Sequence, residues 1–374
     1  MFKDLFKSYI YPIAVFSGGM IGVGFFSLPY IAMKVGVWEM LGYFLVLTGL
    51  VVAINLIFCK ISLKTPDYKR FPGFVGYYLG KWPKIFSLMS VTFSTFGVLL
   101  VYLLVGGQFL ASFFQLILPA GNLVYVLVYF FLVSIIIYFD IKVVAKAEFW
   151  VLFLLFSSLV LIFFSCFAQI KISNIFITDF KLQISNLFLP YGPILFALWG
   201  IGLIPEVEEM IRADKKRLKS IITISTLIVS VFYLLFIFLI LGISGNQTDQ
   251  SALTGLKFFL PNILASAALL IGAFATFTAF VTQGTILKKT LIFDLKIKHW
   301  QAFVMTCSVP LILFLAGLRS FIPLLSFIGG VLLGVDGIFI LMMYKKIGGK
   351  KIIIYPLSLV FLFGIIYEIM YFIK

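Results

Sequence analysis

The sequence predicts an all-α polytopic membrane protein with about 11 transmembrane helices, and three observations lead to this prediction. Of the 374 residues, 63% are hydrophobic and only 11% are charged, whereas a soluble domain has about 25% charged residues. The apolar residues gather in runs long enough to cross a bilayer. The basic residues lie between these runs, mostly in alternate connectors. A chain of this composition cannot cover a water-facing surface, so we expect it to lie in lipid.

Eleven apolar runs are long enough to form spans, because a hydrocarbon core of about 30 Å takes roughly 20 helical residues. Helices are the expected form, since lipid offers no partner for unpaired backbone groups. The predicted spans are residues 9–34, 38–59, 85–118, 123–139, 148–168, 188–211, 220–243, 262–287, 300–317, 321–344 and 352–372. Together they predict one transmembrane domain over residues 1–374.

The basic residues predict the orientation of these spans. Of the 29 Lys and Arg residues, 23 fall in one set of alternate connectors and 6 in the other. Because cytoplasmic connectors are the ones rich in Lys and Arg, we expect a multi-pass protein of the plasma (inner) membrane with its N-terminus cytoplasmic and its C-terminus outside. The same pattern accounts for the net charge of +15. Lipid, and not nucleic acid, is therefore the expected surrounding.

The chain has few side chains that could support catalysis or bind a metal. Cys59, Cys166 and Cys307 lie far apart within apolar runs, and the one histidine, His299, lies in a basic connector. Neither a disulfide framework nor a metal-type spacing is present. We expect no enzyme activity, no cofactor and no bound metal beyond a possible coupling Na+.

Two spans carry glycine clusters that predict broken helices. The first span has four glycines within residues 18–24, followed by Pro29, and the sixth has Gly200 and Gly202, followed by Pro205. Counting about ten residues into each span, at 1.5 Å per residue, places both clusters near the bilayer centre. Interrupted spans at matching depth and of opposite direction are typical of a transporter binding site. The backbone groups that a break exposes can hold a carboxylate and an ammonium.

Glycine also permits close packing of membrane helices, which is the alternative interpretation. Gly330 and Gly334 in span ten fit that pattern, and packing is favoured there. Four glycines within residues 18–24 exceed what packing needs, so a binding site is favoured there. A dinucleotide fingerprint is excluded, because the spacing differs and no strand precedes the glycines.

These motifs resemble those of the amino acid–polyamine–organocation (APC) superfamily, whose fold is shared with the sodium-coupled leucine transporter (the LeuT fold). Within it, the amino acid/auxin permease-like (AAAP) branch is the most similar. The resemblance rests on Gly19-Met-Ile-Gly22-Val-Gly24 with Leu28-Pro29-Tyr30, on Phe196-Ala-Leu-Trp-Gly200 with Pro205-Glu206, and more weakly on Tyr102-LLVGG-Gln108 and Phe327-IGGVLL-Gly334. It implies a 5+5 inverted repeat, with repeat one at about 9–168, repeat two at about 188–345 and an extra helix at about 352–372.

The resemblance also implies a substrate site with helices one and six broken at the midplane. The substrate carboxylate would meet the N–H groups of Val23 and Gly24, and its amino group would meet backbone carbonyls near Met20, Phe196 and Trp199. The Phe196 ring would act as a gate. The predicted substrate-binding residues are Gly19, Met20, Gly22, Val23, Gly24, Phe196, Ala197, Trp199 and Gly200. Gly202 stands where exchangers of cationic amino acids have an acid, so a dicationic substrate is not expected.

Two coupling ions stay open at this stage. The resemblance to the sodium-coupled leucine transporter implies that a sodium site would be formed by Gly18, Ile21, Ala273 and Thr276. Phe277, at the next ligand position, offers no side-chain oxygen, which slightly favours protons. The proton carrier would then be Glu206, because an acid at this depth is costly unless it is paired or protonated.

Three further acids are expected to be structural. Glu208 and Glu209 lie nearer the basic edge and are expected to pair there. Asp336 in span ten is the second candidate for a functional acid within the membrane, but an anchor that reaches toward Lys345 and Lys346 is favoured over a coupling role.

The expected function is secondary active transport of an amino acid or similar small zwitterion by alternating access, coupled to an ion gradient. The alternative is a ligand sensor of the same fold, such as a spore-germinant receptor subunit, in which binding signals without transport. The sequence predicts neither which amino acid is bound nor an oligomeric state.

Overall fold

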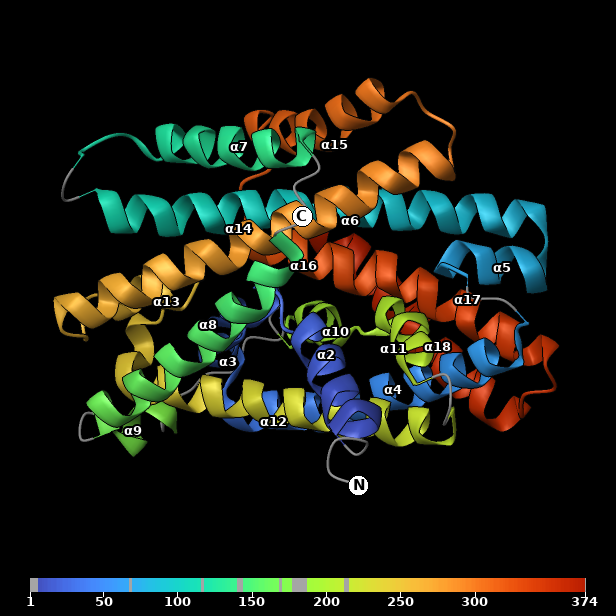
Figure 1. Cartoon of the computed structure of the whole chain (residues 1–374). Coiled ribbons are helices and arrows are strands. Elements are labelled where there is room, and N and C mark those ends of the chain that lie inside the picture. The colour runs from blue at the N-terminus through green and yellow to red at the C-terminus, as the bar shows by residue number, and fades with distance from the viewer. Residues whose placement is uncertain are drawn as a thin grey trace.

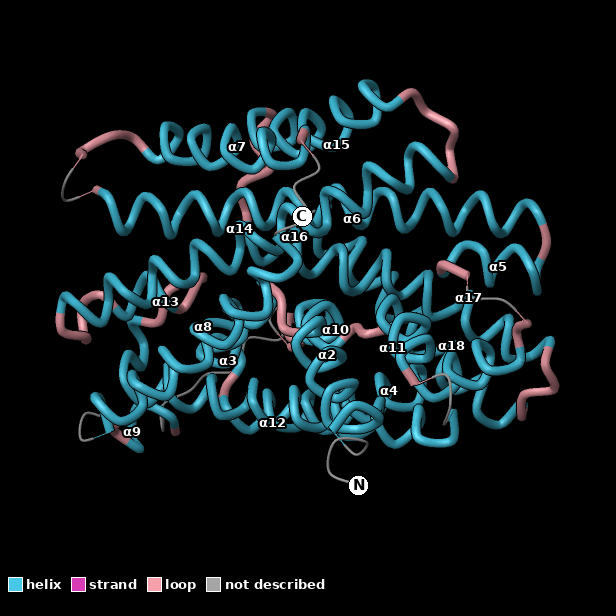
Figure 2. The backbone as a smooth tube through the Cα atoms, in the orientation of Figure 1, coloured by secondary structure: helices cyan, strands magenta, loops and turns pink. Residues whose placement is uncertain are grey.

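The computed structural model describes residues 6–66, 69–115, 118–139, 144–167, 170–176, 187–211 and 215–373. These residues form helices and turns, with no strand among them. Figures 1 and 2 show a bundle in which the long helices cross the view side by side while short helix pieces lie at its centre. Part of the predicted charge pattern, such as Lys142 and Arg212, lies outside the described residues.

Each of the eleven predicted spans corresponds to a helix or to an interrupted helix. Eight are single helices: α4 (Val37–Lys64), α6 (Lys81–Phe114), α7 (Asn122–Tyr138), α8 (Val144–Cys166), α12 (Leu218–Ser244), α14 (Asn262–Phe293), α15 (His299–Leu315) and α18 (Lys351–Ile373). Three are interrupted: α2 (Tyr11–Met20) with α3 (Leu28–Val35), α10 (Tyr191–Leu198) with α11 (Ile204–Met210), and α16 (Phe321–Phe327) with α17 (Leu333–Lys346). Short elements lie before or between the spans: η1 (Phe6–Ile10), α5 (Phe71–Leu79), α9 (Ile172–Ile175), η6 (Lys215–Arg217), η7 (Gly245–Gln247) and α13 (Leu253–Leu256).

Length and composition separate the complete spans from the shorter ones. Within the described residues, six helices are long and apolar enough to cross a bilayer, and the pair Ser8–Met20 and Val23–Val35 makes a seventh, bent by 55°. α7 and α15 have 17 residues each, close to the lower limit of about 17 for a span. The interruption of span ten, a π-helical turn η8 (Ile328–Leu332), was not predicted.

Glycines in left-handed backbone conformations set two of the sharp reversals. Gly36, at φ +95°, separates α3 from α4, and Gly80, at φ +98°, separates α5 from α6. Only glycine adopts such angles without strain. The second turn lays α5 against α6 and α17, and α5 lies within the basic stretch between Lys60 of α4 and Lys84 of α6.

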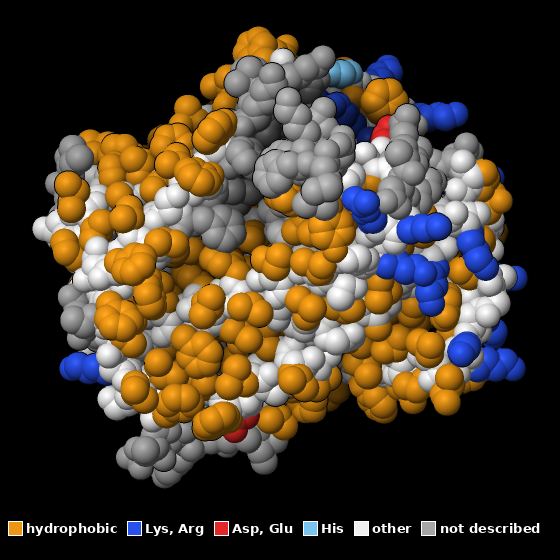
Figure 3. Space-filling model, turned by 60° about the horizontal axis from the view of Figure 1, so that its bottom comes forward, with side chains coloured by type: hydrophobic (Ala, Val, Ile, Leu, Met, Phe, Trp, Pro, Cys, Tyr) orange, Lys and Arg blue, Asp and Glu red, His pale blue; other side chains and the backbone are white. Residues whose placement is uncertain are grey.

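The surface of the bundle is apolar in the way that a lipid-facing protein requires. Large side chains such as Leu45, Phe131 and Phe363 are at least 60% exposed. Figure 3 shows hydrophobic side chains over most of one face, with the Lys and Arg side chains gathered mainly toward one end. In its most apolar window α18 has 17% of its residues buried, against 72% for Phe321–Lys346. α18 therefore lies at the edge of the bundle, although one of its faces packs on α16, η8 and α17.

The interrupted helices occupy the centre. α2 packs on α12 and α11, and α10 packs on η2 (Val23–Ser27), α4, α16 and η8. α6 and α14 pack together, with α7 and α15 on their outer side (Figure 1). The packing predicted for Gly330 and Gly334 is confirmed, because both glycines face side chains of α18.

Candidate functional site

The first span breaks where the glycine cluster predicts. α2 ends at Met20, the next two residues are extended, and a short 3₁₀ helix, η2, leads into α3. Gly22 has φ −113° and ψ −163°, a conformation that any residue can adopt. The backbone conformation itself therefore does not require glycine at position 22. Space is the constraint, because a Cβ at Gly22 would lie 3.0 Å from the Tyr102 hydroxyl.

The sixth span breaks in the same way. α10 ends at Leu198, Trp199 is extended, and the 3₁₀ turn η5 (Ile201–Leu203) leads into α11. In both spans the second helix starts one residue before a proline, Pro29 or Pro205. The similarity between the two sequence motifs is thus matched in structure: each span has a helix, a two-residue non-helical break, a 3₁₀ turn and a second helix.

The two breaks lie against each other. The buried Tyr233 hydroxyl of α12 is 3.1 Å from the carbonyl oxygen of Met20 and 3.1 Å from that of Ala197. A hydroxyl has one proton, so it can donate to only one of these carbonyls at a time. A Cβ at Gly24 would lie 2.6 Å from Cδ1 of Phe196. Close contact between the first and sixth spans therefore depends on glycine at position 24.

A cavity of about 260 Å³ opens between the breaks. It is lined by seven of the nine predicted substrate residues, namely Gly19, Met20, Gly22, Gly24, Phe196, Ala197 and Trp199. Val23 lines a smaller neighbouring cavity instead, and Gly200 is covered by the ring of Phe16. The structure thus gathers most of the predicted set in one place, and their role in binding stays a prediction.

Several residues that line the cavity were not predicted as site residues from the sequence. Ser94, Thr95, Val98 and Tyr102 of α6 line one wall, and Gln283 of α14 another. Polar residues within the apolar runs were the available signal. These helices are hydrophobic on nearly every face, so periodicity does not indicate which face turns inward.

The cavity is closed on one side by aromatic rings. The Phe25 and Phe236 ring centroids are 4.8 Å apart, and those of Phe26 and Phe109 are 5.1 Å apart. These residues follow the break in span one or lie in the later halves of α6 and α12, so they mark the side toward which the odd-numbered spans run.

The cavity itself lies on the opposite side. Phe71 of α5 contributes to its lining, as do Gln283 and Asp336 from the later halves of α14 and of span ten. The structure is therefore closed on the side where the odd-numbered spans end and open toward the basic connectors.

The predicted sodium ligands are partly brought together. Ile21 and Thr276 line a cavity of about 20 Å³, enough for one water-sized occupant. Gly18 and Ala273 do not line it. The Gly18 carbonyl accepts the Ile21 N–H at 3.1 Å, and the Thr276 hydroxyl donates to the Ala273 carbonyl at 2.9 Å.

The acids differ from expectation. Glu206 is exposed, whereas Glu208 is buried and accepts a hydrogen bond of 2.5 Å from Ser62. Glu206 and Glu208 differ in burial because residues two apart on a helix point to nearly opposite sides, and the expectation that Glu208 pairs with the basic residues of this edge stays a prediction. Asp336 is 4% exposed and lines the cavity, so the expectation that it reaches toward Lys345 and Lys346 is wrong. Its Oδ1 has no hydrogen-bond partner among the described residues.

A bundle whose first and sixth spans break around a central cavity defines a class, the secondary transporters of the LeuT fold. Comparison with solved structures supports the fold of this class. MhsT in complex with L-phenylalanine has a TM-score of 0.60 at 14% identity, covering 97% of each chain. Mhp1, a nucleobase-cation-symport-1 family transporter, has a TM-score of 0.65 at 12% identity, covering 96% of this chain and 90% of that one.

A mutant of the manganese transporter of Eremococcus coleocola has a TM-score of 0.65 at 11% identity, covering 99% of this chain and 87% of that one. Identities this low show the fold alone. Within the described residues no group of three or more His, Cys, Asp or Glu side chains could hold a metal ion.

The sequence pattern of the tryptophan/tyrosine permease family matches residues 6–367, and the chain belongs to that family. A search of curated protein sequences finds no match. The protein is an amino acid permease and not an enzyme, which confirms the expected amino acid transport and decides against the sensor, while its coupling to an ion gradient stays a prediction. The fold class, an all-α bundle of LeuT type, is confirmed as well.

Proposed function

We propose that the protein takes up tryptophan or tyrosine through the cavity between the two broken spans. The family assignment supports an aromatic amino acid, and the observation that carries the proposal is the lining of this cavity. Phe196, Trp199, Met20 and Val98 offer an apolar wall for a ring, and Ser94, Thr95 and Tyr102 offer hydroxyls beside it. Apolar walls with a few placed polar groups are typical of ligand sites.

The backbone at the breaks suits the zwitterionic end of the substrate. The first N–H groups of η2 have no partner within their own helix, and they lie beside the Tyr102 hydroxyl, where a carboxylate would bind. The ends of α2 and α10 present carbonyl oxygens, and the negative end of each helix dipole favours an ammonium there. The Tyr233 hydroxyl donates to the carbonyl of Met20 or to that of Ala197, and the other of these two carbonyls is left for the amino group.

The side that is open in this structure is the cytoplasmic side. This orientation rests on the basic connectors, which gather toward one end of the face shown (Figure 3), and places the N-terminus inside and the C-terminus outside. The aromatic closure at Phe25, Phe26, Phe109 and Phe236 then forms the outer gate. Within the APC superfamily, the AAAP branch stays the assignment that the motifs of the first and sixth spans favour.

We propose proton coupling with Asp336 as the carrier instead of Glu206. An acid in the membrane interior is costly unless it is paired or protonated, and Asp336 is the acid that lines the cavity. Ser90 lies within hydrogen-bonding range of its carboxyl. The alternative is sodium, favoured by the small cavity that Ile21 and Thr276 share.

The substrate is tested by uptake of labelled tryptophan into proteoliposomes, with unlabelled amino acids as competitors. We expect tryptophan, tyrosine or both to compete strongly and lysine, leucine and glutamate weakly. Equal competition by leucine would overturn the aromatic assignment.

The coupling ion is tested in the same vesicles. We expect an inward proton gradient without sodium to drive accumulation in the wild type but not in Asp336→Asn, while Glu206→Gln behaves as the wild type. Accumulation that requires sodium and does not respond to the pH gradient would contradict proton coupling and would indicate sodium binding in the cavity lined by Ile21 and Thr276.

A further inference from the structure

The peripheral helix α18 is interlocked with α10 through two glycine notches. The Tyr191 ring of α10 fills the space beside Gly364 of α18, where no Cβ could fit. In return, the Glu368 side chain of α18 lies between Gly192 and Gly330: a Cβ at Gly192 would be 2.8 Å from its Oε1, and one at Gly330 would be 3.0 Å from its Cδ. Each helix thus inserts a polar side chain into a gap that glycine leaves in its neighbour.

The inserted side chains carry polar atoms without hydrogen-bond partners. Glu368 is 1% exposed, and its Oε1 has no partner in the part of the chain that the structure describes. The same holds for the hydroxyls of Tyr191 and Ser326, and Ser326 also touches Gly192. The carboxyl of Glu368 lies within hydrogen-bonding range of the Gly192 N–H. One backbone donor and no cation therefore surround this acid among the described residues.

The titratable groups nearest to Glu368 are tyrosines; Arg319 lines the groove beside them, but its Nε donates to the carbonyl of Phe314 at 3.3 Å. Tyr191 faces it from α10, and Tyr367 and Tyr371 flank it on α18. Behind them are Tyr43 of α4 and Tyr30 of α3.

The other packed elements add no charge at this depth. α16 and η8 contain no titratable side chain. The acid of α17, Asp336, adjoins Gly337, which packs on Phe361, seven residues and about 10 Å along α18 from Glu368. A charged carboxylate at Glu368 would have no counter-ion there, so the protonated form is the one that this packing accommodates.

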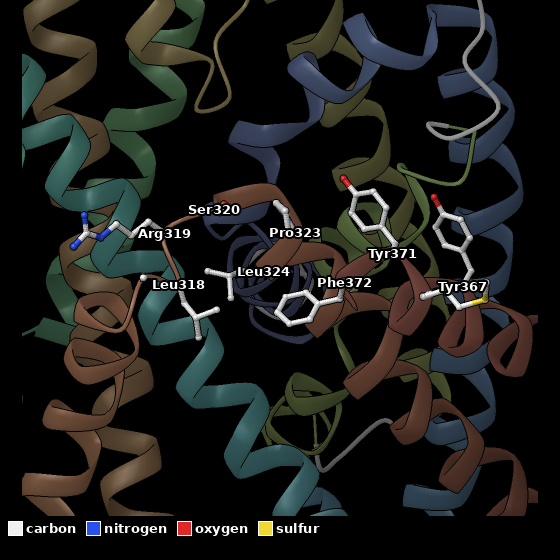
Figure 4. Close-up of a pocket in the computed structure, with 10 residues that line it drawn as sticks. Leu318, Arg319, Ser320, Pro323, Leu324, Tyr367, Tyr371 and Phe372 are labelled. Atoms are coloured by element: carbon white, nitrogen blue, oxygen red, sulfur yellow. The ribbon is translucent and has the colours of Figure 1, made fainter. Parts of the chain in front are cut away.

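A surface groove lies beside this acid's neighbours on α18, because Tyr367 and Tyr371 are among the residues that line it. It has a volume of about 550 Å³ and lies between the turn that precedes α16 and the last turns of α18. Figure 4 shows Tyr367 and Tyr371 of α18 on one side of it and Pro323 and Leu324 of α16 on the other. Glu368 is five residues before the end of α18 at Ile373, about 8 Å along the helix. A small separation of α10 from α18 would open the carboxyl to water from this side.

The position of α10 links this acid to the transport site. α10 has only eight residues, with Tyr191 and Gly192 at one end and Phe196 and Ala197, which line the cavity, at the other. A displacement of α10 as one rigid unit at Gly192 would therefore reach the cavity wall, about 7 Å away.

We propose that Glu368 is a proton-binding site of the outer gate. With its proton bound, the carboxyl fills the Gly192 and Gly330 notch and holds α10 in the outward-closed arrangement. Loss of the proton leaves a charge that only a hydrated, opened notch accommodates, so a higher pH favours opening. This inference concerns the gate alone and does not depend on which amino acid is carried.

The test is a distance measurement between spin labels on Phe188→Cys, just before α10, and Ile263→Cys, at the outer end of α14. Both positions are exposed, at 47% and 79%, and the three native cysteines are buried. Distances are recorded without substrate from about pH 5 to about pH 8. We expect the ratio of open to closed populations to rise by about threefold or more per pH unit, below the tenfold limit set by one proton.

Three variants complete the test in the labelled background. Glu368→Gln, which mimics the protonated carboxyl, should remove the pH response and stay closed, while the control Glu39→Gln, an acid at the outer start of α4, should keep the response. Glu368→Asp, which retains an acid but withdraws it from Gly192, should shift the midpoint, and it carries the test if Glu368→Gln does not fold. A parent protein without pH response, a response that survives Glu368→Gln, or an unshifted midpoint in Glu368→Asp would overturn the proposal. Substrate uptake plays no part in this readout, so its failure is separate from a failure of the permease assignment.

Discussion

Replacing Gly24 with alanine should damage the transport site by adding a single methyl group. The backbone of η2 tolerates alanine at this position, since Gly24 lies within a regular 3₁₀ turn. The added Cβ would lie 2.6 Å from Cδ1 and 3.0 Å from Cε1 of Phe196, and 3.5 Å from Cα of Ala197. The cost is therefore steric and falls on the contact between the two broken spans.

The size of the effect follows from these distances. Carbon atoms in contact are separated by about 3.5–4.0 Å, so the Phe196 ring must move by about 1 Å, either into the cavity or together with α10. Overpacking of this kind costs about 1–3 kcal/mol. Because about 1.4 kcal/mol corresponds to tenfold in affinity, we expect tryptophan binding to weaken by about tenfold, and further for Gly24→Val.

Equilibrium binding of labelled tryptophan to purified protein measures this effect, and size-exclusion chromatography verifies folding. Gly42→Ala is the matched control, because no atom lies within 4 Å of a Cβ there and alanine is the better helix former. We expect Gly42→Ala to bind as the wild type does. A Gly24→Ala protein that binds within about twofold of the wild type would refute the reasoning.

Three further predictions follow from individual contacts. Tyr233→Phe removes the hydroxyl that faces the two carbonyls at the breaks, so the unfolding free energy should fall by about 1 kcal/mol and tryptophan binding should weaken; unchanged thermal stability and affinity would contradict this. Asp336→Asn should abolish accumulation driven by a pH gradient while tryptophan exchange continues, and loss of exchange would instead indicate a role in binding. Gly329→Ala would place a Cβ against the Gly192 carbonyl and 3.0 Å from the Phe196 nitrogen, so we expect a loss of thermal stability of about 1–3 kcal/mol, and a melting temperature equal to that of the wild type would contradict it.

The positions of the two breaks could be predicted from sequence because their causes are local. Glycine and proline at a countable depth, in the motifs from Gly22 to Pro29 and from Gly200 to Pro205, act through the backbone of their own span. The structure places α2 and α10 ends within two residues of those motifs. Most of the predicted substrate residues could be placed at the cavity for the same reason, since they are the residues of the breaks themselves.

The features that could not be predicted from the sequence depend on how the helices are rotated relative to each other. Tyr102 and Gln283 lie in runs that are apolar all round, so their inward orientation has no periodic signal. The difference in burial between Glu206 and Glu208 comes from the rotation of the short helix α11. Glu368 stands alone in an apolar run, and only the packing of α18 on Gly192 and Gly330 shows its environment.

The most direct test of the account is a structure of the protein with tryptophan bound. We predict density for the ring beside Phe196 and Val98, with the carboxylate at the start of η2 near Tyr102 and the amino group at the carbonyl ends of α2 and α10. Tryptophan bound elsewhere, with the cavity between the two breaks unchanged, would contradict the central claim that the broken spans form the transport site.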